Sequence, residues 1–156
     1  MCDYSLCGLP TRLAAEGEQL VVHRFRTGSL GLASPAELTA ALCPREQRRS
    51  FWEWIKSAFD DTTSGPQVTA ICIPPGAQLT LRSIPLDLQK RWNVNPQESV
   101  FFVQTSANVN SYRDAVQFGS GLKVLLQDLR QGMPVQVESL GGEAPVEEHD
   151  LALELR

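Results

Sequence analysis

The chain has 156 residues and a formal net charge of −4, and this length suits one compact domain with a sizeable core. Its composition, 42% hydrophobic and 21% charged, is that of an ordinary globular protein and excludes an extended disordered chain. No apolar run approaches the ~20 residues that cross a bilayer, and Asp3 stands where a signal peptide carries positive charge. We therefore expect a cytoplasmic protein without a membrane partner.

The negative charge is concentrated in residues 141–156, where five acidic residues accompany one arginine. The rest of the chain is neutral overall, which argues against a nucleic-acid partner because phosphate binding needs concentrated Lys and Arg. We interpret residues 141–156 as an acidic C-terminal tail outside the folded domain. Its leucines alternate as in an arm that docks like an edge strand: Leu151, Leu153 and Leu155.

Alternating side chains predict a strand at 19–26, with Val21, His23 and Phe25 on one face. The stretch "GSLGLASP" that follows is rich in small residues. We interpret this stretch as a loop that leads from the strand to a helix.

A helix-start pattern comes next in the chain. Ser34 occupies the N-cap, Pro35 the first helical position, and Glu37 completes a capping box. Pro44 disfavours helical geometry in the residue before it, so we expect this helix to end near Cys43.

Pro44 also begins a second predicted helix, whose apolar residues recur at spacings of three and four along one face. The turn-forming sequence "DDTTSGP" ends this helix. Together the two helices make a helical insertion at about 33–62. The apolar face consists of Phe51, Trp54, Ile55, Ala58 and Phe59.

Short strands make up most of the remaining chain, and "GSG" joins two of them as a hairpin. We expect a single α+β domain over residues 1–140, in which an antiparallel β-barrel-like sheet carries the helical insertion. The expected strands lie at 67–73, 78–84, 99–105, 112–118, 122–129 and 134–140, with a short helix at 85–92.

We expect one core that joins the second helix to these strands. Cys72 stands in the apolar run "VTAICIPP", which predicts a small, reduced and buried cysteine. The expected core residues are Trp54, Phe59, Phe101, Val103, Val116, Val124 and Leu126.

The N-terminal segment "MCDYSLC" is the main candidate for chemistry. Removal of Met1 would leave Cys2 with a thiol and a free α-amine, whose reference pKa values of ~8.5 and ~8 lie close to neutrality. Thiolate and amine form a five-membered chelate on a soft transition metal, and Asp3, Cys7 and His23 are candidate further ligands. Alternatively, the amine activates Cys2 as a nucleophile. A third interpretation is that Cys2 only begins a strand.

Most other catalytic signals are missing from the sequence. It contains no P-loop, no dinucleotide-binding fingerprint and no Gly-x-Ser-x-Gly elbow. We therefore favour a non-enzymatic binding or accessory protein that uses its N-terminal cysteine to bind a soft metal or a thiol-reactive ligand. The alternatives are an N-terminal-nucleophile hydrolase or acyl-transfer enzyme with Cys2 as the catalytic residue, and an interaction subunit without chemistry of its own. A protein partner is expected in either non-enzymatic case.

Several motifs resemble known families. The start "MCDYSL", the "RF" after the first strand, the "PPG" turn between apolar runs and the "GSGLKVLL" hairpin resemble an uncharacterised family of small bacterial proteins that begin with the same six residues. That resemblance implies a shared fold and adds no mechanism. "MC" and the "GLP" at 8–10 are similar to hydrogenase-maturation chaperones, small β-barrels whose cysteine after Met binds an iron centre. In this sequence "GLP" follows Cys7, not Cys2. Glutamine amidotransferases also begin Met-Cys, but Asp3 replaces their glycine.

Overall fold

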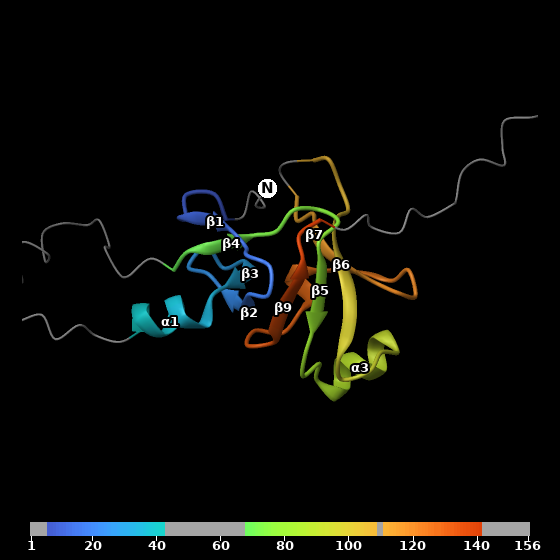
Figure 1. Cartoon of the computed structure of the whole chain (residues 1–156). Coiled ribbons are helices and arrows are strands. Elements are labelled where there is room, and N and C mark those ends of the chain that lie inside the picture. The colour runs from blue at the N-terminus through green and yellow to red at the C-terminus, as the bar shows by residue number, and fades with distance from the viewer. Residues whose placement is uncertain (1–5, 43–67, 109–110, 142–156) are drawn as a thin grey trace, which may run out of the picture.

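The computed structural model of the protein describes residues 6–42, 68–108 and 111–141. These residues form one nine-stranded sheet, two α-helices and a short 3-10 helix, so the expected mixture of helices and a mainly antiparallel sheet is confirmed (Figure 1). The expected second helix and the acidic tail beyond Gly141 lie outside the described residues. The elements are β1 Thr11–Leu13, β2 Gln19–Arg24, β3 Leu30–Ala33, α1 Pro35–Leu42, β4 Ala70–Cys72, β5 Gln78–Leu81, α3 Leu86–Trp92, β6 Glu98–Gln104, β7 Asp114–Phe118, β8 Lys123–Leu125, η2 Leu126–Asp128 and β9 Pro134–Ser139.

The strands follow the order β1-β4-β3-β2-β9-β5-β6-β7-β8. Neighbouring strands are antiparallel except β1 and β4, which are parallel. The strand order is open, with β1 and β8 at its two ends, so the expected barrel is not closed. β9 lies in the middle, between β2 and β5 (Figure 1).

One side chain links the two arms of this open sheet. The side-chain amide of Gln127 in η2 accepts a hydrogen bond from the Leu30 N–H at 2.9 Å and donates one to the Leu30 carbonyl at 2.7 Å. Nearby, the hydroxyls of Ser29 and Tyr112 lie 3.4 Å apart. Gln127 therefore supplies to β3 the pair of hydrogen bonds that a neighbouring strand would make.

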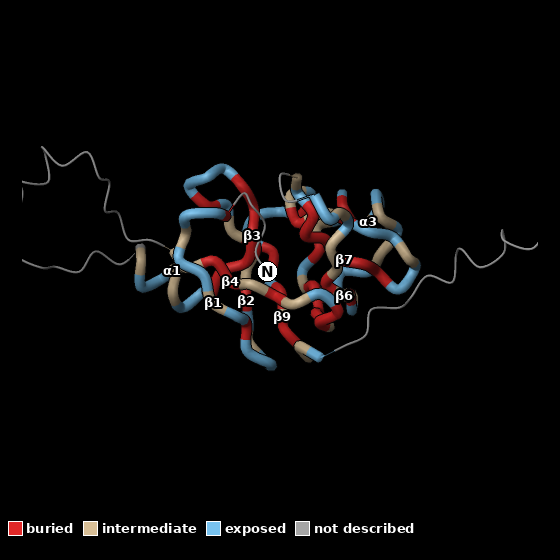
Figure 2. Tube along the Cα trace, turned by 90° about the horizontal axis from the view of Figure 1, so that it is seen from above, coloured by how far each residue is buried: buried red, intermediate tan, exposed pale blue. Residues whose placement is uncertain are grey.

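The main hydrophobic core lies on the inner face of the sheet, where the buried residues of β3, β2 and β9 run through the middle of the molecule (Figure 2). Within β6, Val100 and Phe102 point into this core, whereas Phe101 and Val103 are half-buried on the outer face. The expected core was therefore wrong by one residue along β6, because alternate side chains of a strand face opposite sides. Val116, Val124 and Leu126, also expected in the core, are confirmed there. The other two expected core residues, Trp54 and Phe59, lie outside the described residues.

A smaller apolar cluster covers part of the outer face near β3 and β4. Gly31 makes room for it, since a Cβ there would lie 3.0 Å from the Phe25 ring and 3.1 Å from the Leu6 side chain. Leu6 thereby anchors the beginning of the described chain onto β3. The cluster consists of Leu6, Phe25, Ala33 and Ala70, with Leu9, Leu38 and Val68 packed against it.

Several local expectations need correction. The "GSLGLASP" stretch contains β3, whose four residues are all buried, so the strand shows no polar alternation that the sequence could reveal. β1 was not expected at all. The expected strand at 122–129 ends at Leu125, where η2 begins.

Glu37 belongs to an ion-pair network between β1 and α1 rather than to the expected capping box. Arg12 donates from Nε to Glu37 at 2.8 Å and from Nη1 to Glu18 at 3.1 Å. The hydrogen bond from Arg12 lowers the pKa of the Glu18 carboxyl. This network holds the edge strand β1 against the start of α1 and the turn before β2.

Cys72 differs from the expected reduced and buried residue. It is half-buried in β4 and disulfide-bonded. Its immediate neighbours in the apolar run, Ile71 and Ile73, are buried. The apolar run therefore predicted the strand correctly but not the state of its thiol.

Candidate functional site

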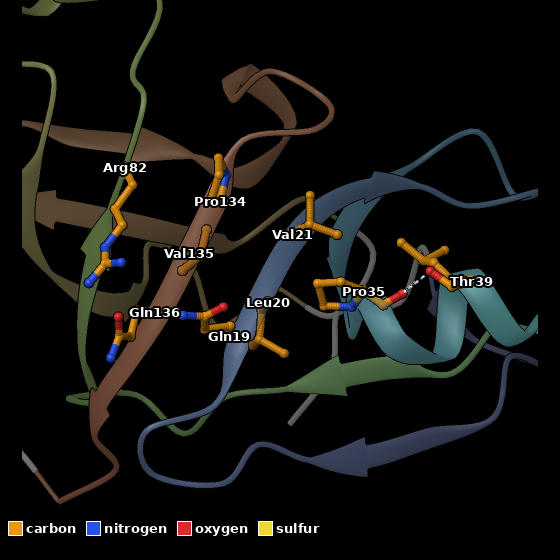
Figure 3. A pocket seen from close by; sticks show the side chains of 10 residues that line it. Gln19, Leu20, Val21, Pro35, Thr39, Arg82, Pro134, Val135 and Gln136 are labelled. Atoms are coloured by element: carbon orange, nitrogen blue, oxygen red, sulfur yellow. Dashed lines mark hydrogen bonds between the residues drawn. The ribbon is translucent and has the colours of Figure 1, made fainter.

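A groove of about 380 Å³ lies on the outer face of the sheet, between α1 and the end of β5 (Figure 3). We call it the α1 groove. Strands β2 and β9 form its floor, α1 forms one wall, and Arg82 stands at the opposite end (Figure 3). The side chains that define it are Gln19, Val21, Pro35, Leu38, Thr39, Arg82, Pro134 and Gln136.

The register of β2 and β9 arranges the floor as two facing pairs. Gln19 lies opposite Gln136, and Val21 lies opposite Pro134. Because side chains alternate across a strand, these four share the outer face, while Leu20 and Val135 between them are buried in the core. The floor therefore offers two amide groups at one end and an apolar surface at the other.

Arg82 follows β5 and is fixed by its backbone, whose N–H donates to the Pro134 carbonyl at 2.9 Å. Its side chain is half-buried, and its Nε is a buried atom without a hydrogen-bond partner. On the same outer face, the carboxylate of Glu138 accepts a hydrogen bond from the Thr80 hydroxyl at 2.8 Å. Arg82 itself forms no ion pair with any residue that the structure describes.

The wall made by α1 is mainly apolar toward the groove. Thr39 donates its hydroxyl to the Pro35 carbonyl at 2.9 Å, as the dashed line in Figure 3 shows. Leu38 packs against the smaller apolar cluster, which ties this part of α1 to the sheet. Arg82 is therefore the one charged residue among the described residues that line the groove.

The predicted N-terminal metal site is only partly within the described residues, since Cys2 and Asp3 lie outside them. Cys7 is exposed and has a free thiol. His23 is half-buried, meets the Phe25 ring edge-on at 5.0 Å, and has its pKa lowered by burial. In the part of the chain that is described, no group of three or more His, Cys, Asp and Glu side chains could hold a metal. The site therefore stays a prediction.

A second hollow of about 500 Å³ lies between the end of α3 and β8. Arg91 and Asp128 line it and are both exposed, and Lys123 and Trp92 contribute further to its wall. Charges of both signs on a solvent-exposed rim favour no single class of ligand. The α1 groove, with one sign of charge and a partly apolar floor, is the more selective of the two hollows.

Comparisons with models of known protein families, with characterised proteins and with solved structures find no match to this chain. The resemblances in its motifs therefore stay predictions. No helix in the described residues has the length and apolar character needed to cross a membrane. The chemistry of the α1 groove has to be argued from its own residues.

Sequence reasoning missed the α1 groove entirely. In the sequence its floor corresponds only to alternate residues of two strands, Gln19 and Val21 in "QLVV" and Pro134 and Gln136 in "PVQVES". Arg82 is likewise the last of the polar residues that alternate with leucines in "QLTLR". The sequence does not reveal that these three strands are neighbours, since long stretches of the chain separate each strand from the next.

Proposed function

We propose that this protein is a non-enzymatic binding protein and that the α1 groove is its ligand site. The observation that carries this proposal is a groove of about 380 Å³ with a partly apolar floor and a few convergent polar groups. Small-molecule sites have this character, with volumes of ~300–1,000 Å³. The described residues that line it include no His, Cys, Asp or Glu, so they supply no conventional general base or nucleophile. This composition favours binding over catalysis.

Filling the floor of the groove is expected to abolish ligand binding. Val21→Trp places an indole over the apolar end, where Val21 faces Pro134. In amide NMR spectra of the wild type, small apolar fragments should shift the resonances of Thr39 and Gln136, and Val21→Trp should remove these shifts. Val103→Trp is the matched control, because Val103 is also half-buried on the outer face but does not line the groove. Fragments that leave the groove resonances of the wild type unchanged would contradict the proposal.

We further propose a second function, in which Cys2 binds a soft transition metal with Asp3, Cys7 and His23. The supporting observation is the position of Leu6, which precedes Cys7 and packs at Gly31, the cross-strand partner of His23. The chain next to Cys7 is thus anchored beside the strand that carries His23. Burial lowers the pKa of His23 and favours the neutral imidazole, the form that binds metals.

Natively purified protein is expected to contain metal that is lost in Cys2→Ser and reduced in His23→Gln. Affinity should rise with pH, because the thiols must deprotonate to bind. His149→Gln is the matched control, since His149 is the other histidine of the sequence. Elemental analysis and intact mass spectrometry provide the measurements. Retained Met1 would exclude both the amine chelate and the N-terminal nucleophile, and equal metal near zero in all variants would leave an interaction subunit with a protein partner.

A further inference from the structure

Arg82 differs from the other shielded arginines of the described chain. Three arginines are buried or half-buried there, and Arg12 pairs with Glu18 and Glu37. The Nε of Arg113 is a buried atom without a hydrogen bond, as the Nε of Arg82 is, but Arg113 takes part in another interaction. Arg82 has neither an ion pair nor a side-chain hydrogen bond, although its Nε is buried. A shielded guanidinium N–H without an acceptor is uncommon, because water no longer satisfies it.

The position of Arg82 decides where an acceptor has to come from. Its backbone is fixed between β5 and β9 by the hydrogen bond to Pro134, and its side chain lies at the end of the α1 groove (Figure 3). The carboxylate of Glu138 on the same face accepts a hydrogen bond from Thr80 and forms no ion pair with Arg82. A molecule in the groove can therefore bring oxygen atoms to the Arg82 guanidinium. Carboxylates fit the planar fork of arginine with two parallel hydrogen bonds.

The remaining lining limits the charge and the shape of that molecule. Arg82 is the one charged residue among the described lining residues, so the groove neutralises one negative charge. A second negative charge would be removed from water without a partner, which is unfavourable. Next to Arg82 the floor offers the apolar surface of Pro134 and then of Val21. The Gln136 and Gln19 amides lie side by side along the neighbouring row of the floor (Figure 3). The lining thus suits one anionic end and an apolar body.

We infer that the ligand of the α1 groove is a small organic monocarboxylate with an apolar body, whose carboxylate pairs with Arg82. This inference rests on the proposed binding function and adds the chemical class of the ligand. The apolar body would lie along the floor between β2 and α1, over Val21. Benzoate is the simplest molecule that carries both features, and benzamide is its uncharged counterpart of the same shape.

The experiment measures the affinity of benzoate, benzamide and phenyl phosphate by NMR titration of the full chain. We expect wild-type protein to bind benzoate at least about tenfold more tightly than benzamide, which corresponds to about 1.4 kcal/mol. Arg82→Gln should weaken benzoate binding by about tenfold or more and leave benzamide binding unchanged. Arg82→Lys should give an intermediate affinity, because it keeps the charge but loses the fork. Arg91→Gln, at an exposed arginine outside the groove, should bind benzoate like the wild type.

The outcomes separate this inference from the binding function on which it rests. If benzamide binds as tightly as benzoate and Val21→Trp abolishes both, the groove binds ligands but the carboxylate inference is wrong. If phenyl phosphate binds more tightly than benzoate, the limit to one negative charge is wrong. If none of the probes shifts groove resonances, the binding function itself fails. Thermal melting shows whether the Arg82→Gln variant folds. If this variant does not fold, the affinities of the wild type for benzoate and benzamide alone test whether the groove prefers a carboxylate.

Discussion

Replacing Phe102 by alanine is expected to lower the free energy of unfolding by about 3–5 kcal/mol, the usual cost of removing a buried phenylalanine. Phe102 is 2% exposed and belongs to the main core on the inner face of the sheet. It is also held in the sheet on both sides, because it lies opposite Val116 of β7 and its N–H donates to the Ala77 carbonyl at 2.8 Å. The cavity left by its ring would be lined by a β-sheet that cannot easily collapse.

The adjacent phenylalanine provides the matched control for this prediction. Phe101 is half-buried on the outer face, so Phe101→Ala is expected to cost less than half as much as Phe102→Ala. Urea denaturation of both variants, followed by circular dichroism, measures the difference. Equal losses, or a larger loss for Phe101→Ala, would show that the register of β6 is shifted by one residue from the one described.

Truncation of Gln127 to alanine is expected to cost about 2–4 kcal/mol, an unusually large effect for a half-buried glutamine. The side chain satisfies both the N–H and the carbonyl of Leu30, at 2.9 Å and 2.7 Å. Leu30 is 3% exposed, so alanine at position 127 leaves two shielded backbone groups without partners. Each unsatisfied buried group costs ~1–3 kcal/mol.

Gln131→Ala is the control, because Gln131 is exposed and forms no side-chain hydrogen bond in the described chain. Its effect should stay within ~0.5 kcal/mol. The urea midpoints of the two variants provide the comparison, and hydrogen exchange of the Leu30 amide reports the local change. A Gln127→Ala variant as stable as Gln131→Ala would mean that water replaces the amide at no cost and that the link between β3 and η2 contributes nothing to stability.

Local sequence patterns predicted the elements that alternate polar with apolar residues or that begin or end at a proline or a glycine turn. The strand at 19–26, the helix after Pro85 and the "GSG" hairpin all lie where the sequence places them. In contrast, β3 has four buried residues and no alternation, so its small residues resembled a loop. The apolar run "VFFV" in β6 fits either register, and only its pairing with β5 and β7 selects Phe102 as the inward residue. Local patterns carry no information about such partners.

The α1 groove could not be predicted for a related reason. Its floor depends on the contact of β2 with β9, and its charged end depends on the contact of β9 with β5. Arg82 looked like an ordinary strand-end arginine in the sequence, because nothing local shows that its side chain is left without a partner. By contrast, the N-terminal segment predicts a metal site from its composition alone, because Cys2, Asp3 and Cys7 are metal-ligating residue types that stand close together in the sequence.

The central position of β9 has a consequence for synthesis of the protein. β9 is the last strand of the described chain, yet it alone connects β2 with β5 through backbone hydrogen bonds. A growing chain on the ribosome therefore completes the strands on either side before it can join them. Until β9 leaves the exit tunnel, β2 and β5 each present an open edge to neighbouring chains, and open edges promote aggregation. Assembly of the complete sheet must follow translation of residue 139, so slow synthesis of the segment that contains β9 would prolong the period in which these two edges are open.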